Sequence, residues 1–160
     1  MIWEISPLIG LGPLKFGMKP EDIALIDGLG PVTNSFKAYD GSVNEYRTMD
    51  IPVCNYAKGI LAAVDTNSQV KNLTLDGMDI YNTPPLQVIQ TLERLNGGAK
   101  SGLGSMLFIN IGINISGFYI EEEKRLYEPE AEERDERGLG MFIKGAFDSV
   151  IDEYEEITFL

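Results

Sequence analysis

The sequence predicts a single α+β domain over residues 1–160, with an antiparallel sheet of about five to six strands and two to three helices packed against it. A chain of 160 residues with 44% hydrophobic residues has the size of one domain and can bury a sizeable core. Short β-type runs follow one another between residues 35 and 75. Proline-led segments that close on glycine indicate short helices.

Three segments have the signals of helices. Pro20–Gly28 has proline at the first helical position, acidic residues in the first turn and glycine at its end. Thr83–Leu95 has Thr83 as the expected N-cap, a mostly apolar face, and two glycines shortly after its last turn. Apolar residues at helical spacing predict an amphipathic helix from about Leu139 to Glu155. A hairpin that turns at Lys144-Gly145 is the alternative for this last segment.

The strands are predicted by short runs of β-type residues, with turn chemistry at Asp65–Ser68. The strongest of them is Ile109–Ser116, where isoleucines alternate with small and polar residues. Its isoleucines are expected to face the core and to leave a smooth outer face, with a bulge or bend at Gly112 or Gly117. The other predicted strands are Ser35–Tyr39, Asn44–Met49, Gly59–Val64 and Val70–Leu75.

The formal net charge of −12 is spread unevenly along the chain. Residues 121–160 contain 14 acidic and 5 basic residues and carry −9, whereas residues 1–120 carry −3. Such a field repels nucleic-acid phosphates and anionic lipids and attracts a basic protein surface. Direct nucleic-acid binding is therefore disfavoured. The alternative is that the acidity serves solubility alone.

The acidic segment 121–138 is predicted to be a mobile loop. Glu121–Arg137 is dominated by charge, has Pro129 in its middle, and offers few apolar residues for burial. The sequence therefore predicts that proteases cut this segment first.

The chain contains no histidine, which removes the commonest general base and metal ligand and every Ser-His or Cys-His pair. Asp65–Asp76 resembles a calcium loop, but Val70 occupies the position that needs glycine. Gly97–Ser105 resembles a phosphate-binding loop, but it follows a predicted helix and precedes a strand, the reverse of the required order. No metal or cofactor is expected.

Secretion and membrane insertion are both disfavoured. The first five residues lack the basic start and apolar stretch of a signal peptide, and no run of eighteen apolar residues occurs. The single cysteine, Cys54, lies among apolar neighbours and is interpreted as a small buried hydrophobic residue. This composition fits a reducing cytoplasm.

The motif Phe16–Ile23, followed by Leu29-Gly30-Pro31, resembles a pattern of small bacterial immunity proteins from polymorphic and contact-dependent growth inhibition toxin systems. The resemblance continues into Gly77–Tyr81 and the predicted helix after it, and covers about residues 8–95. The glycine-methionine-proline-acid motif is also shared with β-lactamase-inhibitor-like and outer-membrane-assembly lipoprotein domains. Those domains usually have serine or threonine at the helix cap, where this chain has Lys19.

The immunity resemblance implies a cytoplasmic, non-catalytic protein that binds a cognate toxin domain, often a basic nuclease, and blocks its active site or substrate surface. Carboxylates near the C-terminus would occupy the cationic groove, with tyrosines as anchors. Two alternatives remain: an interaction, assembly or small-ligand module of the same fold type, and a carboxylate enzyme with a raised pKa in a cleft. The partner-binding candidates are Tyr119, Glu121, Glu122, Glu123, Tyr127, Glu128, Glu130, Glu132, Glu133, Asp135, Glu136, Asp148, Asp152, Glu153 and Tyr154.

Overall fold

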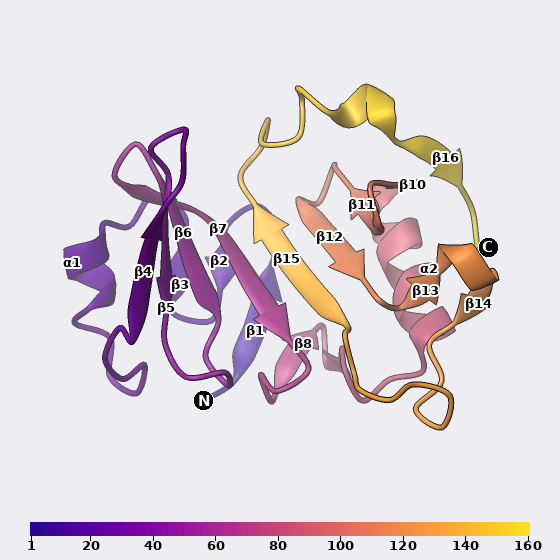
Figure 1. The fold of residues 1–160 in the computed structure, drawn as a ribbon, viewed down its shortest axis with the longest axis horizontal. Helices are drawn as coiled ribbons and strands as arrows, with labels where there is room; N and C mark the ends of the chain where they lie inside the picture. Colours follow the sequence, from indigo (N-terminus) through magenta and orange to yellow (C-terminus); the bar gives the residue numbers. More distant parts are fainter.

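The computed structural model describes residues 1–160 and shows a mostly β protein (Figure 1). Sixteen strands form three sheets, and helix is confined to two α-helices and two short 3-10 helices. The predicted α+β fold with about five to six strands and two to three packed helices is therefore wrong. Five of the strands are only two residues long, and runs this short cannot display a period-two pattern in the sequence.

The chain alternates short strands with tight turns. In order, its elements are β1 (Trp3–Ser6), β2 (Gly10–Leu11), β3 (Leu14–Lys15), α1 (Pro20–Ile23), β4 (Asn34–Lys37), β5 (Val43–Tyr46), β6 (Val53–Ala57), β7 (Ile60–Asn67), β8 (Leu73–Leu75), β9 (Met78–Asp79), α2 (Pro85–Asn96), β10 (Ala99–Gly102), β11 (Ser105–Phe108), β12 (Ile113–Ser116), β13 (Tyr119–Ile120), η1 (Glu121–Glu123), β14 (Arg125–Leu126), β15 (Gly138–Phe142), η2 (Ile151–Glu153) and β16 (Glu155–Ile157).

The largest sheet is antiparallel throughout and has nine strands in the order β16-β10-β11-β12-β15-β7-β6-β5-β4. One meander runs from β4 to β7, a second runs from β10 to β12, and β15 lies between them (Figure 1). Met141 of β15 is paired with Ile113 of β12 on one side and with Val64 of β7 on the other. All three side chains are buried. The strand β15 therefore joins the two meanders through both hydrogen bonds and packing.

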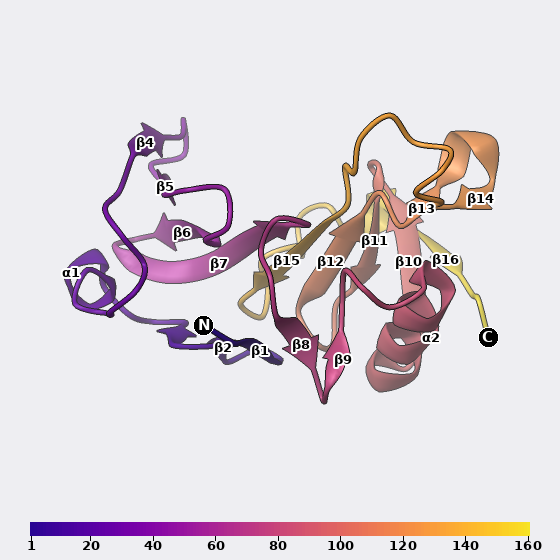
Figure 2. The same cartoon turned by 90° about the horizontal axis from the view of Figure 1, so that it is seen from below.

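The main core lies between this sheet and a second layer. A five-stranded sheet has the order β3-β2-β1-β8-β9, with β1 parallel to β8. Figure 2 shows β1, β2, β8, β9 and α2 on one side of the large sheet. The core between the layers contains 26 buried residues, among them Trp3, Leu73, Ile89 and Phe108. At about 1.5–3 kcal/mol for each large side chain removed from water, this core is the main stabilising contact of the fold.

The opposite, outer face of the large sheet is covered only in part, by residues 143–154, which we call the C-terminal arm. Phe147, Val150 and Ile151 of the arm pack on a small cluster of Leu107, Phe142 and Tyr154. The predicted helix from Leu139 to Glu155 is therefore wrong, since its first residues form β15 and only Ile151–Glu153 is helical. Gly145 has a φ of 89°, which turns the chain away from the sheet.

The helix predicted at Thr83–Leu95 is confirmed as α2, and Gly97 ends it in the left-handed conformation. The expected N-cap is wrong, because Pro84 occupies that position and no side chain caps the helix. The first predicted helix is shorter than expected, because α1 covers only Pro20–Ile23.

The strand predicted at Ile109–Ser116 is half right. Its second half is β12, with Ile113 and Ile115 buried as expected, but residues 109–112 form the turn between β11 and β12. Asn96 of α2 caps this turn by accepting the backbone N–H groups of Asn110 and Ile111. Gly112, expected at a bend, has a φ of 65° in the turn.

The turn predicted at Asp65–Ser68 begins later, because β7 extends to Asn67.

No helix in the chain has both the length and the apolar character needed to cross a membrane.

Cys54 is fully buried, as the sequence predicts, and burial raises the pKa of its thiol. We expect a thiol reagent such as DTNB to label the native protein at pH 8 at least roughly 100-fold more slowly than the unfolded chain, because labelling requires local opening. One equivalent should react rapidly in concentrated guanidinium chloride. Rapid labelling of the native protein would contradict this burial.

Candidate functional site

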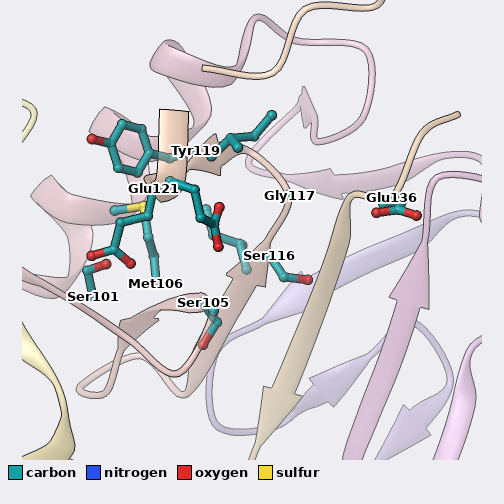
Figure 3. Close-up of a pocket in the computed structure, with 12 residues that line it drawn as sticks. Ser101, Ser105, Met106, Ser116, Gly117, Tyr119, Glu121 and Glu136 are labelled. Carbon is teal, nitrogen blue, oxygen red and sulfur yellow. The ribbon is translucent and has the colours of Figure 1, made fainter. Parts of the chain in front are cut away.

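A pocket of about 200 Å³ opens at the ends of β11 and β12 (Figure 3). It receives residues from the β10–β11 turn, the end of β12, β13, η1 and the segment before β15. Figure 3 shows Tyr119 and Glu136 on opposite sides of it. The lining residues are Ser101, Gly104, Ser105, Met106, Ile115, Ser116, Gly117, Tyr119, Ile120, Glu121, Glu122 and Glu136.

The pocket is acidic, because three of its lining residues are carboxylates and none is basic. Glu121 and Glu122 are exposed and form no ion pair within the chain. Glu136 lies 3.1 Å from Arg134, but both side chains are mostly exposed, so water and salt weaken this pair. Three serine hydroxyls and the Tyr119 ring complete the polar lining. The arrangement suits a cationic group that also donates hydrogen bonds.

Gly117 allows the chain to form this pocket. It follows β12 with a φ of 77°, and a Cβ at this position would lie 2.9 Å from the backbone oxygen of Glu136. A side chain here would therefore push the end of β12 away from the segment that carries Glu136. The hairpin β13–β14 then pairs Tyr119 with Leu126, and the Tyr119 ring packs edge-on against Phe159 with their centroids 5.0 Å apart.

The acidic segment is held together partly by its own ion pairs. Arg125 binds the carboxylates of both Glu123 and Glu132. Glu132 also accepts the backbone N–H of Glu128. Two of the predicted partner-binding acids, Glu123 and Glu132, are thus engaged in contacts within the loop.

Arg137 forms the second anchor and is only 8% exposed. Its Nη2 donates to the backbone oxygen of Tyr81 at 3.0 Å and to Asp135 at 2.8 Å. The guanidinium also lies 4.2 Å from the centre of the Tyr127 ring. Burial alone would raise the pKa of Asp135, but the hydrogen bonds from Arg137 outweigh it and hold that pKa below its ordinary value. Asp135 and Tyr127 therefore support the fold.

The remaining predicted residues are divided between surface and core. Tyr154 is buried in the small cluster under the C-terminal arm. The structure leaves six acids exposed outside the pocket: Glu128, Glu130 and Glu133 on the loop, and Asp148, Asp152 and Glu153 on the arm. Only Tyr119, Glu121, Glu122 and Glu136 meet in the pocket.

Sequence reasoning missed the three serines of the pocket, Ser101, Ser105 and Ser116. Two of them belong to the β10–β11 hairpin, whose contact with η1 depends on the tertiary fold. For Ser116 there was a signal, since its position in the alternating strand placed it on the outer face.

A second, wider depression of about 550 Å³ lies between the end of α2 and strands β10, β11 and β16. Its buried carboxylate, Glu93, accepts hydrogen bonds from the Thr158 hydroxyl at 2.6 Å and the Phe159 N–H at 2.8 Å. These bonds attach the C-terminal residues to α2. Lys100 and Glu156, which also line the depression, have opposite charges, so it favours no single class of ligand.

Comparison with protein-family models, curated proteins and solved structures finds no match for this chain. No three acidic or cysteine side chains converge in an arrangement that could hold a metal ion. Partial loss of water around the exposed Asp65 carboxyl raises its pKa, but Asp65 lies on β7, outside the acidic pocket. What the pocket itself offers is three carboxylates and three hydroxyls for the recognition of a cation.

Mobility of the segment 121–138 stays a prediction, and limited proteolysis tests it. We expect trypsin to cut the free protein first within Glu121–Arg137, and at Arg134 before Arg137. The reason is that the Arg134 side chain is 83% exposed, whereas Arg137 is buried under aromatic rings. Mass spectrometry of the first fragments identifies the bond. First cleavage elsewhere in the chain would show that the ion pairs keep this segment closed.

Replacing Arg137 with alanine should lower the free energy of unfolding by about 3 kcal/mol. The substitution leaves the Asp135 carboxylate without its ion-pair partner and removes the cation over the Tyr127 ring. Since the folded-state pKa of Asp135 is depressed, this stabilisation is present at neutral pH. It is lost as the pH falls below about 4 through that pKa. Urea unfolding at pH 7 and pH 3 measures both effects.

The control for this substitution is Arg134→Ala, which removes the same type of side chain from an exposed pair. Its unfolding curve should overlay that of the wild type. Equal destabilisation by the two substitutions would show that Arg137 is no internal anchor.

Proposed function

We propose that this chain is a toxin-neutralising immunity protein that binds a cognate, basic toxin domain of the nuclease type and blocks its active site or substrate surface without turnover. The observation that carries the proposal is the acidic pocket, which combines three carboxylates, three serines and Tyr119 and contains no basic residue. A nuclease binds phosphates in a cationic groove. A protein that offers carboxylates in the same groove competes with the nucleic acid.

Recognition at the pocket follows from the chemistry of its lining. Glu121 and Glu122 form no ion pair, so a lysine or arginine of the partner need not displace an internal one. Serine hydroxyls accept the remaining N–H groups of a guanidinium, and the Tyr119 ring lies beside it. Each charge-assisted hydrogen bond contributes about 1.5–3 kcal/mol when it is shielded from water.

The charge around the pocket favours rapid encounter with a basic partner. Residues 121–160 carry −9, and exposed acids of the loop and the C-terminal arm contribute to that field. Attraction of this kind accelerates association and weakens as salt is added. We place the complex in the cytoplasm, where the unpaired Cys54 is compatible with reducing conditions.

The alternative is a non-catalytic interaction or assembly module, and exposed apolar side chains favour it. Phe36 is 59% exposed, Met49 is 61% exposed and Tyr39 is fully exposed. They lie in and beside the β4–β5 hairpin, at the opposite end of the molecule from β13 and β14 (Figure 1). A partner that docks on this hairpin would not require the acidic pocket.

Neutralising the pocket tests the proposal directly. We expect the triple variant Glu121→Gln, Glu122→Gln, Glu136→Gln to weaken binding to the toxin domain at least about 100-fold, because each lost charge-assisted contact costs about 1.5–3 kcal/mol. We expect the toxin domain to be encoded by the neighbouring gene, whose product is co-expressed and purified with this chain for the test. Calorimetry at 50 and 300 mM salt measures the affinity, and nuclease assays measure neutralisation.

The matched control is the triple variant Glu128→Gln, Glu130→Gln, Glu133→Gln, which also removes three negative charges but from exposed positions outside the pocket. It should slow association through the weaker field but leave the dissociation rate unchanged. Equal losses in both triple variants would show that only total charge matters. A co-purified partner without toxic activity would remove the immunity function altogether.

A further inference from the structure

A row of unpaired polar side chains crosses the outer face of the large sheet next to the acidic pocket. Gly138 and Gly140 of β15 lie on this face and carry no side chain, which leaves a gap along the strand that neighbouring side chains cover in part, so that Gly140 is buried. Asp65 of β7 flanks this gap on one side, and Asn114 and Ser116 of β12 flank it on the other. In Figure 1 no segment passes in front of the centres of β12, β15 and β7.

The side-chain oxygens of the flanking residues lie close to the two glycines. A Cβ on Gly140 would lie 2.6 Å from Asn114 Oδ1 and 2.7 Å from Asp65 Oδ1, so both oxygens face one point. A Cβ on Gly138 would lie 3.3 Å from the Ser116 hydroxyl. None of these three polar side chains forms a hydrogen bond or an ion pair within the chain, and Asp65 is exposed. We call Asp65, Asn114 and Ser116 the acceptor row.

Strand interiors normally carry side chains that pack on their cross-strand neighbours. Here two consecutive outward positions of a central strand are glycine, and the polar neighbours turn toward the gap without bonding to one another. Oxygen atoms that converge in this way offer hydrogen-bond acceptors to a donor from outside. Asp65 is the one acidic side chain of the row, so a cationic donor is favoured over a neutral one.

We infer that the acceptor row is a second cation subsite of the same interface, and that it binds a lysine or arginine side chain of the basic partner. This inference rests on the proposed function, which supplies that partner. The acidic pocket and the acceptor row share Ser116, so they form one continuous surface.

The spacing of the two subsites specifies the form of the partner segment. Asn114 lies two residues before Ser116 on the same strand, a separation of about 6.8 Å. Alternate side chains of an extended peptide have this same separation. An extended segment with basic residues at i and i+2 can therefore place one side chain in the acidic pocket and the next against Asp65 and Asn114.

The surroundings of Asp65 agree with this assignment. Although the Asp65 side chain is exposed, the neighbouring strands displace part of the water around it, which raises the pKa of its carboxyl, and no basic group of the chain compensates. A bound ammonium or guanidinium would stabilise the carboxylate form and lower that pKa.

The test uses a synthetic hexapeptide of alternating arginine and serine, with a hexapeptide of alternating citrulline and serine as the uncharged control. Backbone amide signals of the ¹⁵N-labelled protein are followed during titration at 50 mM salt. We expect the arginine peptide to shift the signals of Asp65, Asn114 and Gly140 together with those of Gly117 and Glu121. The citrulline peptide should shift neither group.

Two substitutions separate the subsites. Asp65→Asn keeps the shape of the row but removes its charge, and should weaken peptide binding at least about tenfold. Gly140→Ala inserts a methyl group between the two converging oxygens and should abolish the shifts at Asn114. Asp27→Asn, which changes an exposed acid after α1, outside the pocket and the row, is the matched control for charge and should leave binding unchanged.

The outcomes distinguish the two proposals. Shifts at Gly117 and Glu121 without shifts at Asp65 and Asn114, or full binding by Asp65→Asn, would overturn the acceptor row and leave the acidic pocket standing. Absence of shifts at every one of these residues would remove both the row and the pocket as cation sites. If Gly140→Ala does not fold, the Asp65→Asn titration decides.

Discussion

The pairing of β15 with both β7 and β12 is the contact on which the rest of the structure depends. Without this strand, the two meanders of the large sheet share no hydrogen bonds with each other. Thr66 of β7 reinforces the junction, since its hydroxyl donates to the backbone oxygen of Leu139 at 2.9 Å and bonds the Tyr81 hydroxyl at 2.8 Å. Pairing over this sequence distance costs loop-closure entropy, which the buried Met141 and Leu139 side chains offset.

The same strand places the functional candidates. Glu136 of the acidic pocket and the anchor Arg137 directly precede β15, and the C-terminal arm directly follows it. Once β15 is inserted, Arg137 reaches the carbonyl of Tyr81, and Glu136 comes close to the end of β12. The pocket is therefore a consequence of the insertion.

The two faces of β15 carry different kinds of residue. Leu139 and Met141 face the core, whereas Gly138 and Gly140 face outward and lie beneath polar neighbours. Glycine in a strand interior loses more conformational entropy on folding than a residue with a side chain. Glycine at Gly140 leaves room for the Asn114 and Asp65 side chains, and the acceptor row that we propose would account for that arrangement.

What the sequence predicts correctly is local. The helix α2 was predicted because a proline start, an apolar face and a glycine end lie within a dozen residues. The burial of Cys54, Ile113 and Ile115 followed from their immediate neighbours. The strand β15 was missed because its partners lie elsewhere in the chain, while the residues after it repeat at a helical spacing. That spacing arises from packing of the arm on Phe142 and Leu107, and a helix is not needed for it.

The candidate site was predicted only in part, because the sequence shows local composition and not the contacts between distant residues. Crowding of acids toward the C-terminus indicated an anionic surface, but local composition does not tell which carboxylates have an internal cation. Glu123 and Glu132 share an ion pair with Arg125, and Asp135 pairs with Arg137, so the acids that remain for a partner are fewer than the charge count suggests. Salt therefore acts differently on the paired carboxylates and on those of the pocket. The enclosed pair of Arg137 is screened little, whereas the open carboxylates of the pocket are screened strongly. Stability should therefore depend weakly on ionic strength, whereas recognition at the pocket should depend on it steeply.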